Sequence, residues 1–136
     1  MGSQENAESW IWIHQFLNDF SHPGWAVYVQ TARNLIAALE GRGLNTLFRI
    51  GQSVDHIIIS TKEEHGLDGE PHVTFAIDRK EPKLLVAYGT LNLHFSEAQS
   101  EETCAADVAV PVVLSYLRRL WIETKPGSPV PAQLAD

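Results

Sequence analysis

Histidines could bind a metal ion in this protein, and their spacing in the sequence indicates whether they do so. His56, His72 and His94 fall in segments with the alternating pattern of β-strands, and imidazoles that converge on one sheet face can bind zinc. The sequence contains no His-x-His and no His-x-x-x-His pair, so no local spacing supports such a site. We therefore expect half-exposed strand residues, no metal ion and no cofactor.

Carboxylates gather in a second segment, where Glu63, Glu64, Asp68 and Glu70 surround His65. Oxygen-rich loops can bind a hard cation, but calcium loops place their ligands at alternate positions and close with a glutamate. The spacing here does not fit that template. The segment is therefore predicted to be a solvated hairpin loop.

Nucleophilic catalysis finds no support in the sequence. Cys104 is the single cysteine and lies between the pair Glu101-Glu102 and Asp107, whose charges raise a thiol pKa and disfavour the reactive thiolate. No serine lies in a nucleophile-elbow pattern, and no glycine-rich phosphate-binding loop is present. The sequence therefore predicts no catalytic residue.

Large apolar residues crowd the first predicted helix, residues 5–20. One stripe at helical spacing consists of Trp10, Ile13, Leu17 and Phe20, and further apolar residues beside it are Ile11, Trp12 and Phe16. A helix that is apolar on more than one side needs more than one surface to cover it. Two interpretations follow: the helix is wedged between the sheet and a neighbouring helix, or Trp10, Trp12 and Phe16 form an interface with another protein, where tryptophan is enriched.

A second candidate site is a ligand pocket between the helices and the sheet. Its polar groups would come from Trp25, Asp55, His56 and Tyr88. Asp55 shares a strand face with isoleucines, and a buried carboxylate must be paired or protonated. A structural ion pair with an arginine therefore competes with any chemical role for this residue.

The elements that position these residues occur in an order that predicts an α+β fold. Helical periodicity marks residues 5–20, 23–40 and 108–124, and strand patterns mark residues 44–51, 54–60, 72–78 and 83–95. We expect an N-terminal αα-hairpin, a four- to five-stranded antiparallel β-meander and a C-terminal helix packed on one sheet face. Residues 1–125 are predicted to form a single domain, and residues 126–136 a disordered C-terminal tail.

Charge narrows the class of partner. The chain has 136 residues, a formal net charge of −7 and a pI near 5.3, values that argue against binding to a nucleic-acid backbone.

No apolar run reaches the roughly 20 residues needed to span a bilayer, and no signal-peptide pattern precedes Trp10. A single cysteine lends no support to secretion, so we expect a cytoplasmic protein.

Together these patterns predict a non-catalytic protein-interaction protein: a small acidic homodimer that binds another, possibly basic, protein. Its size, acidity, helix-flanked meander and surplus of aromatic residues resemble those of small dimeric secretion chaperones and toxin-neutralising immunity proteins, although such chaperones place a helix between their strands. The alternative is a small-molecule-binding domain or small enzyme that uses the predicted pocket.

Overall fold

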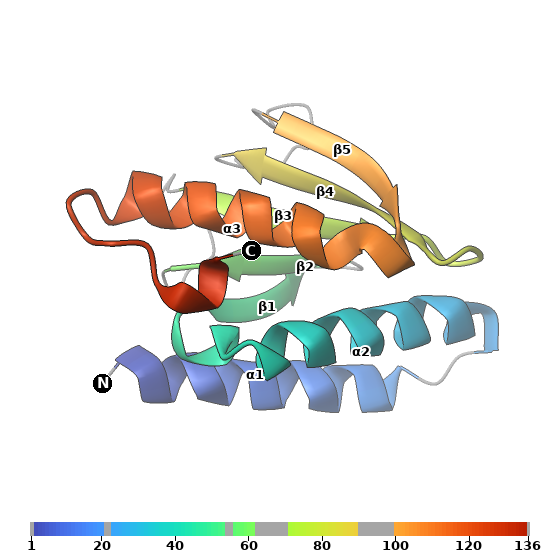
Figure 1. Cartoon of the computed structure of the whole chain (residues 1–136). Helices are drawn as coiled ribbons and strands as arrows, with labels where there is room; N and C mark the ends of the chain where they lie inside the picture. The colour runs from blue at the N-terminus through green and yellow to red at the C-terminus, as the bar shows by residue number, and fades with distance from the viewer. Residues whose placement is uncertain (1, 21–22, 54–55, 62–70, 90–99, 136) are drawn as a thin grey trace.

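The computed structural model describes residues 2–20, 23–53, 56–61, 71–89 and 100–135. In this part of the chain, two helices precede an antiparallel sheet of five strands, and a third helix follows it, so the predicted α+β class is confirmed (Figure 1). The helices are α1 (Gly2–Asp19), α2 (Ala26–Gly41) and α3 (Ala109–Thr124). The strands are β1 (Arg49–Ser53), β2 (His56–Ser60), β3 (His72–Ile77), β4 (Lys83–Gly89) and β5 (Ser100–Ala105).

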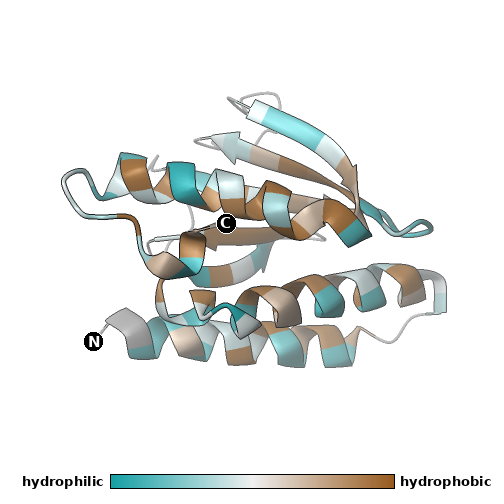
Figure 2. Cartoon of the chain, viewed as in Figure 1, coloured by the Kyte–Doolittle hydropathy of each residue, from teal (hydrophilic) through white to brown (hydrophobic). Residues whose placement is uncertain are grey.

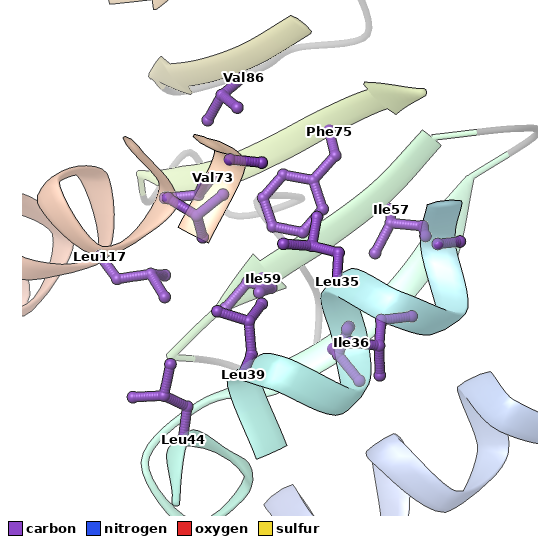
Figure 3. Packing of buried hydrophobic residues seen from close by; sticks show 14 of the residues in the cluster. Leu35, Ile36, Leu39, Leu44, Ile57, Ile59, Val73, Phe75, Val86 and Leu117 are labelled. Atoms are coloured by element: carbon purple, nitrogen blue, oxygen red, sulfur yellow. The ribbon is translucent and has the colours of Figure 1, made fainter. Parts of the chain in front are cut away.

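The sheet is a meander in which each strand pairs with the next, in the order β1-β2-β3-β4-β5. Its register places apolar residues opposite one another in rows: Ile57 pairs with Phe75, and Phe75 with Val86. Because strand side chains alternate between faces, this register gathers the apolar residues on one face. Helices α2 and α3 cover that face, and Figure 3 shows their residues Leu35, Ile36, Leu39 and Leu117 beside Ile57, Ile59, Val73 and Phe75.

The first two helices form the expected αα-hairpin, running side by side in opposite directions (Figure 1). Polar contacts join them: His14 Nε2 lies 2.5 Å from Glu40 Oε1, and the Arg33 guanidinium donates to Asn18 Oδ1 at 2.6 Å. Helix α1 also lies along β1, where the backbone N–H of Ile50 donates to Ser9 Oγ at 3.0 Å. One edge of the sheet is therefore covered by a helix.

The first predicted strand differs from the structure at its start. Residues Leu44–Thr46 form a short 3-10 turn, and the strand begins only at Arg49. Gly43 precedes the turn with φ at 81°, a left-handed conformation that glycine adopts without strain. Leu44 and Phe48 are both fully buried at a spacing of four, which suits a turn of helix better than alternating strand faces.

The fifth strand is formed by polar and acidic residues that lie outside the predicted strand segments. Ser100–Ala105 pairs with β4, with Leu84 opposite Cys104 and Val86 opposite Glu102. An edge strand can keep polar side chains because it needs to bury little of its surface, and Figure 2 shows hydrophilic colour along much of β5. The alternating residues 91–95, the last part of the predicted strand segment 83–95, lie outside the described residues.

The C-terminal segment departs from the expected disorder. Residues Ala132–Leu134 form a 3-10 turn, and the Leu134 side chain is fully buried in the core. Arg118 Nη1 donates to the carbonyl oxygen of Leu134 at 2.7 Å, and Arg42 Nε donates to that of Gln133 at 3.3 Å. One buried leucine and two arginines therefore hold a segment whose prolines and polarity predicted no structure.

Candidate interaction surface

Helix α1 turns one apolar side to the core and another to solvent. Trp10, Ile13 and Leu17 are fully buried, whereas Ile11 is 61% exposed and Trp12 is 47% exposed. Trp10 also donates its indole N–H to the carbonyl oxygen of Phe48 at 3.0 Å. Trp10 is therefore a core residue and is not available to the predicted interface. Successive helix residues are rotated by about 100°, so Trp10 and Trp12 face nearly opposite ways.

The outward Trp12 begins a continuous row of aromatic rings. Trp12 stacks on Phe16 with ring centroids 5.9 Å apart and 13° between the planes, and Phe16 meets Phe20 edge-on at 5.5 Å. Phe20 in turn lies 4.8 Å from Trp25, which precedes α2. The intervals of four residues place the rings of Trp12 and Phe16 on one side of α1, with Phe20 following just after its end. We call Trp12, Phe16, Phe20 and Trp25 the aromatic row.

The end of the row opposite Trp12 is held by a core tyrosine and by an arginine. Tyr28, which is fully buried, contacts both Phe20 and Trp25 with centroid distances of 5.6 and 5.3 Å. The Arg79 guanidinium lies 4.2 Å from the Trp25 ring centroid, a cation–π arrangement. Trp12 is therefore the exposed end of a supported stack, and its orientation is restrained before any partner binds.

The charge on α1 has one sign. The helix carries Glu5, Glu8 and Asp19 and contains no lysine or arginine. Glu5 forms an ion pair with Arg49 of β1, while Glu8 and Asp19 are exposed. The apolar surface of Ile11, Trp12 and Phe16 therefore lies between exposed carboxylates.

The residues predicted to form a pocket are not brought together. Trp25 belongs to the aromatic row, and Tyr88 is fully buried on the helix-covered face of β4. His56 is half-buried on the opposite face of β2, since it precedes the core residue Ile57. Asp55 lies outside the described residues. A pocket that joins Trp25, His56 and Tyr88 is therefore not formed.

A groove of about 800 Å³ lies elsewhere, between α2 and the start of α3. Its walls are mainly apolar, with Leu35, Ala38 and Val110 among them, and its polar groups include Thr31 and Asp107. None of the predicted pocket residues lines it. The separation of two helices distant in sequence creates this groove, and no local pattern could have indicated it.

A polar cluster lies where α3 crosses β4 and β5. The Arg119 guanidinium stands 4.2 Å from the Tyr88 ring centroid and donates to Glu123 Oε2 at 2.7 Å and to Ser100 Oγ at 2.8 Å. Burial and the neighbouring Glu123 carboxylate raise the pKa of Tyr88 above its ordinary value, while Arg119 opposes them. Arg119 is thus engaged by three neighbours, which fits a structural role.

Replacing Tyr88 with phenylalanine should flatten the loss of stability at high pH. The unfolded chain ionises this tyrosine near pH 10, whereas burial keeps it protonated in the fold. The stability that the neutral phenol provides is therefore complete below about pH 10 and is lost as pH rises toward the folded pKa. Urea unfolding at several pH values from about 8 to 11 measures this dependence. The unfolding free energy of Tyr88→Phe should fall less steeply with rising pH than that of the parent. Tyr116→Phe, at a half-buried site, is the control, and an equal or larger effect there would contradict this assignment.

Comparisons with known proteins add no relative. No family model, no curated protein and no solved structure matches this chain. Within the described ranges, no helix is long and apolar enough to cross a membrane, and no three histidine, cysteine, aspartate or glutamate side chains gather as a metal site. The case for function therefore depends on the surfaces described above.

Proposed function

We propose that this protein is a non-catalytic protein-interaction module, a small acidic domain of the chaperone, adaptor or immunity type. It binds through Ile11, Trp12 and Phe16 on α1, and a second copy of the chain is the partner to test first. The observation that carries the proposal is the exposure of two adjacent large apolar side chains, 61% for Ile11 and 47% for Trp12.

The physical argument starts from the exposed aromatic end of the row. Tryptophan at the centre of an interface often contributes 2 kcal/mol or more, because it buries a large area with few rotatable bonds. Stacking on Phe16 orders the Trp12 ring in the free chain, which lowers the entropy lost on binding. Exposed carboxylates on the same helix supply a polar rim.

Replacing Trp12 with alanine should weaken self-association by about thirtyfold or more, the equivalent of a 2 kcal/mol hot spot. Light scattering over a dilution series measures the dissociation constant. The matched control is Ile122→Ala, which removes a side chain that is 57% exposed on α3 and is not part of the aromatic row. This control should leave the dissociation constant unchanged.

Two outcomes would each contradict one part of the proposal, the location of the contact or the dimer itself. Equal weakening by Trp12→Ala and Ile122→Ala would place the dimer contact outside the aromatic row. A monomer at every concentration would exclude the dimer. A photo-crosslinker at position 12 in cells, compared with one at position 122, would then test for a different partner, and crosslinking at neither position would end the interaction proposal.

The alternative function, small-molecule binding, is favoured by the groove between α2 and α3. Its volume of about 800 Å³ lies within the range of ligand pockets, and Thr31 and Asp107 provide polar groups in a mainly apolar wall. Ala38 lies in this wall and is exposed, so Ala38→Trp would fill the groove without disturbing the core. A ligand lost in Ala38→Trp but retained in Trp12→Ala would favour this function over the first.

A further inference from the structure

Strand β5 is the second edge of the sheet that the described strands form. At the opposite edge, α1 lies along β1, whereas among the described strands β5 pairs only with β4 (Figure 1). Its side chains are exposed at Glu101, Glu102, Thr103 and Ala105. An edge of this kind presents backbone groups that can pair with another strand.

The register identifies which backbone groups face outward. The N–H of Ala106 donates to the carbonyl oxygen of Pro82 at 2.8 Å, at the point where the β4–β5 ladder ends. Hydrogen-bonded pairs recur at every second residue of an antiparallel ladder, so Glu102 and Cys104 bond to β4. The N–H and C=O groups of Glu101, Thr103 and Ala105 therefore point away from the sheet.

The edge is also selective by charge. Glu101 and Glu102 are consecutive, so their carboxylates lie on opposite faces of the sheet. Two cations near this edge already have carboxylate partners: Arg119 pairs with Glu123, and Lys83, which pairs in register with Ala105, lies 3.0 Å from Glu81. On the helix-covered face, the Glu102 carboxylate also interacts with the Tyr116 hydroxyl of α3. Pairing β5 with a second β5 would bring four carboxylates into one strand pair, which like-charge repulsion opposes.

We propose that the β5 edge is a docking site for an extended basic segment of another protein, which adds to the sheet as a further strand. Two consecutive basic residues would pair with Glu101 and Glu102, one on each face. Opposite Thr103, Cys104 and Ala105, whose side chains are small, β-branched residues would fit. Backbone bonds provide affinity in this mode of recognition and the side chains provide specificity.

The same carboxylates also protect the free protein. Charged side chains on an edge strand deter aggregation through strand pairing. These carboxylates repel β5 of a second copy, and an uncharged strand would bring no positive charge to balance them. The same negative charge therefore both deters aggregation and favours a basic strand. This site lies at the sheet edge opposite α1, which separates it from the surface proposed above.

The test uses the full chain, labelled for amide NMR, and a blocked peptide Thr-Val-Thr-Lys-Arg-Thr. In antiparallel pairing its lysine and arginine lie opposite Glu102 and Glu101. The reversed sequence tests the parallel arrangement, and a peptide with glutamine in place of both basic residues is the control. In the free chain the amides of Glu101, Thr103 and Ala105 should exchange rapidly, and saturating peptide should slow their exchange by about tenfold or more.

Two substitutions in β5 separate strand addition from simple charge attraction. Thr103→Pro removes an outward N–H that the fold does not use, a position where edge strands accept proline, and should weaken binding at least about tenfold. Thr103→Val keeps the N–H and should bind as the parent does. The double charge reversal Glu101→Lys with Glu102→Lys, at exposed positions, should abolish binding without lowering the thermal midpoint.

Three results would overturn the proposal. The first is no binding of either basic peptide at about 1 mM in low salt, the weak end of the affinity scale. The second is binding that is lost on charge reversal but unchanged in Thr103→Pro, which would show attraction without strand pairing. The third is an edge whose amides are already protected in the free chain, since another segment or copy would then occupy it.

Discussion

Replacing Trp10 with alanine is expected to lower the free energy of unfolding by about 3–5 kcal/mol. The side chain is fully buried between α1 and the start of the sheet, so its removal leaves a cavity the size of an indole. It also removes the hydrogen bond to the Phe48 carbonyl oxygen. Domains of this size are stable by about 5–15 kcal/mol, so the loss is a large part of the total.

Trp12→Ala is the matched control for this prediction. The two tryptophans belong to the same helix and lie two residues apart, yet Trp12 is 47% exposed. At concentrations at which the chain is monomeric, its removal should change stability much less, by about 1 kcal/mol or less, since little buried volume is lost and one ring stack is broken. Denaturation in urea, followed by circular dichroism, measures both variants. Similar losses in the two would mean that α1 is not oriented as described.

Trp10→Phe divides the Trp10 effect into packing and hydrogen bonding. Phenylalanine keeps much of the ring volume but cannot donate to the Phe48 carbonyl oxygen. Leaving a buried acceptor without its partner costs about 1–3 kcal/mol. Trp10→Phe should therefore lie between the parent and Trp10→Ala, and a variant as stable as the parent would show that the indole N–H is dispensable.

Leu134→Ala is expected to destabilise the fold by about 2–3 kcal/mol, toward the lower part of the range for buried leucine. The lower value is expected because Leu134 belongs to a 3-10 turn of three residues, and this short segment can detach from the fold rather than leave a cavity. Detachment would also release Arg118 and Arg42 from the carbonyl groups they contact. The free energy of docking the segment is therefore the upper limit of the effect.

Val130→Ala provides the control for the C-terminal segment. Val130 is exposed, so its truncation should leave the unfolding free energy unchanged within about 0.5 kcal/mol. Amide exchange after Leu134→Ala should show faster exchange at Leu134 and Ala135, whose N–H groups bond to Pro131 and Ala132 in the 3-10 turn. Unchanged stability in Leu134→Ala would support the disorder that the sequence suggested for this segment.

The order and type of the main elements follow from local periodicity in the sequence. In α2, the spacing of Tyr28, Ala32, Leu35, Ile36 and Leu39 predicts the face that the structure buries. In β3, Val73, Phe75 and Ile77 alternate toward the core in the same way, but His72 and Thr74 on the opposite face are also buried, so the expectation of a half-exposed His72 is wrong. Such patterns are sufficient because a helix or strand with one apolar face can bury it in few ways.

The sequence pattern also predicts the side of α1 on which each of its two tryptophans lies. Trp10 shares the helical stripe of Ile13 and Leu17, whereas Trp12 is rotated by about 200° from it. Excess apolar residues on the helix obscured this distinction, because they widened the apolar surface beyond a single stripe. The angular positions of the residues on the helix place Trp10 toward the core and Trp12 and Phe16 away from it.

The remaining features depend on contacts between distant residues, and only the tertiary structure determines them. Strand β5 forms because β4 provides a pairing partner, although its own polar and acidic residues show no strand pattern. Leu134 is ordered because the core and two arginines receive it, although its neighbours predict disorder. The groove between α2 and α3 is set by the separation of two helices. Local composition cannot predict any of these three features, because the residues that stabilise or form each one lie far apart along the chain.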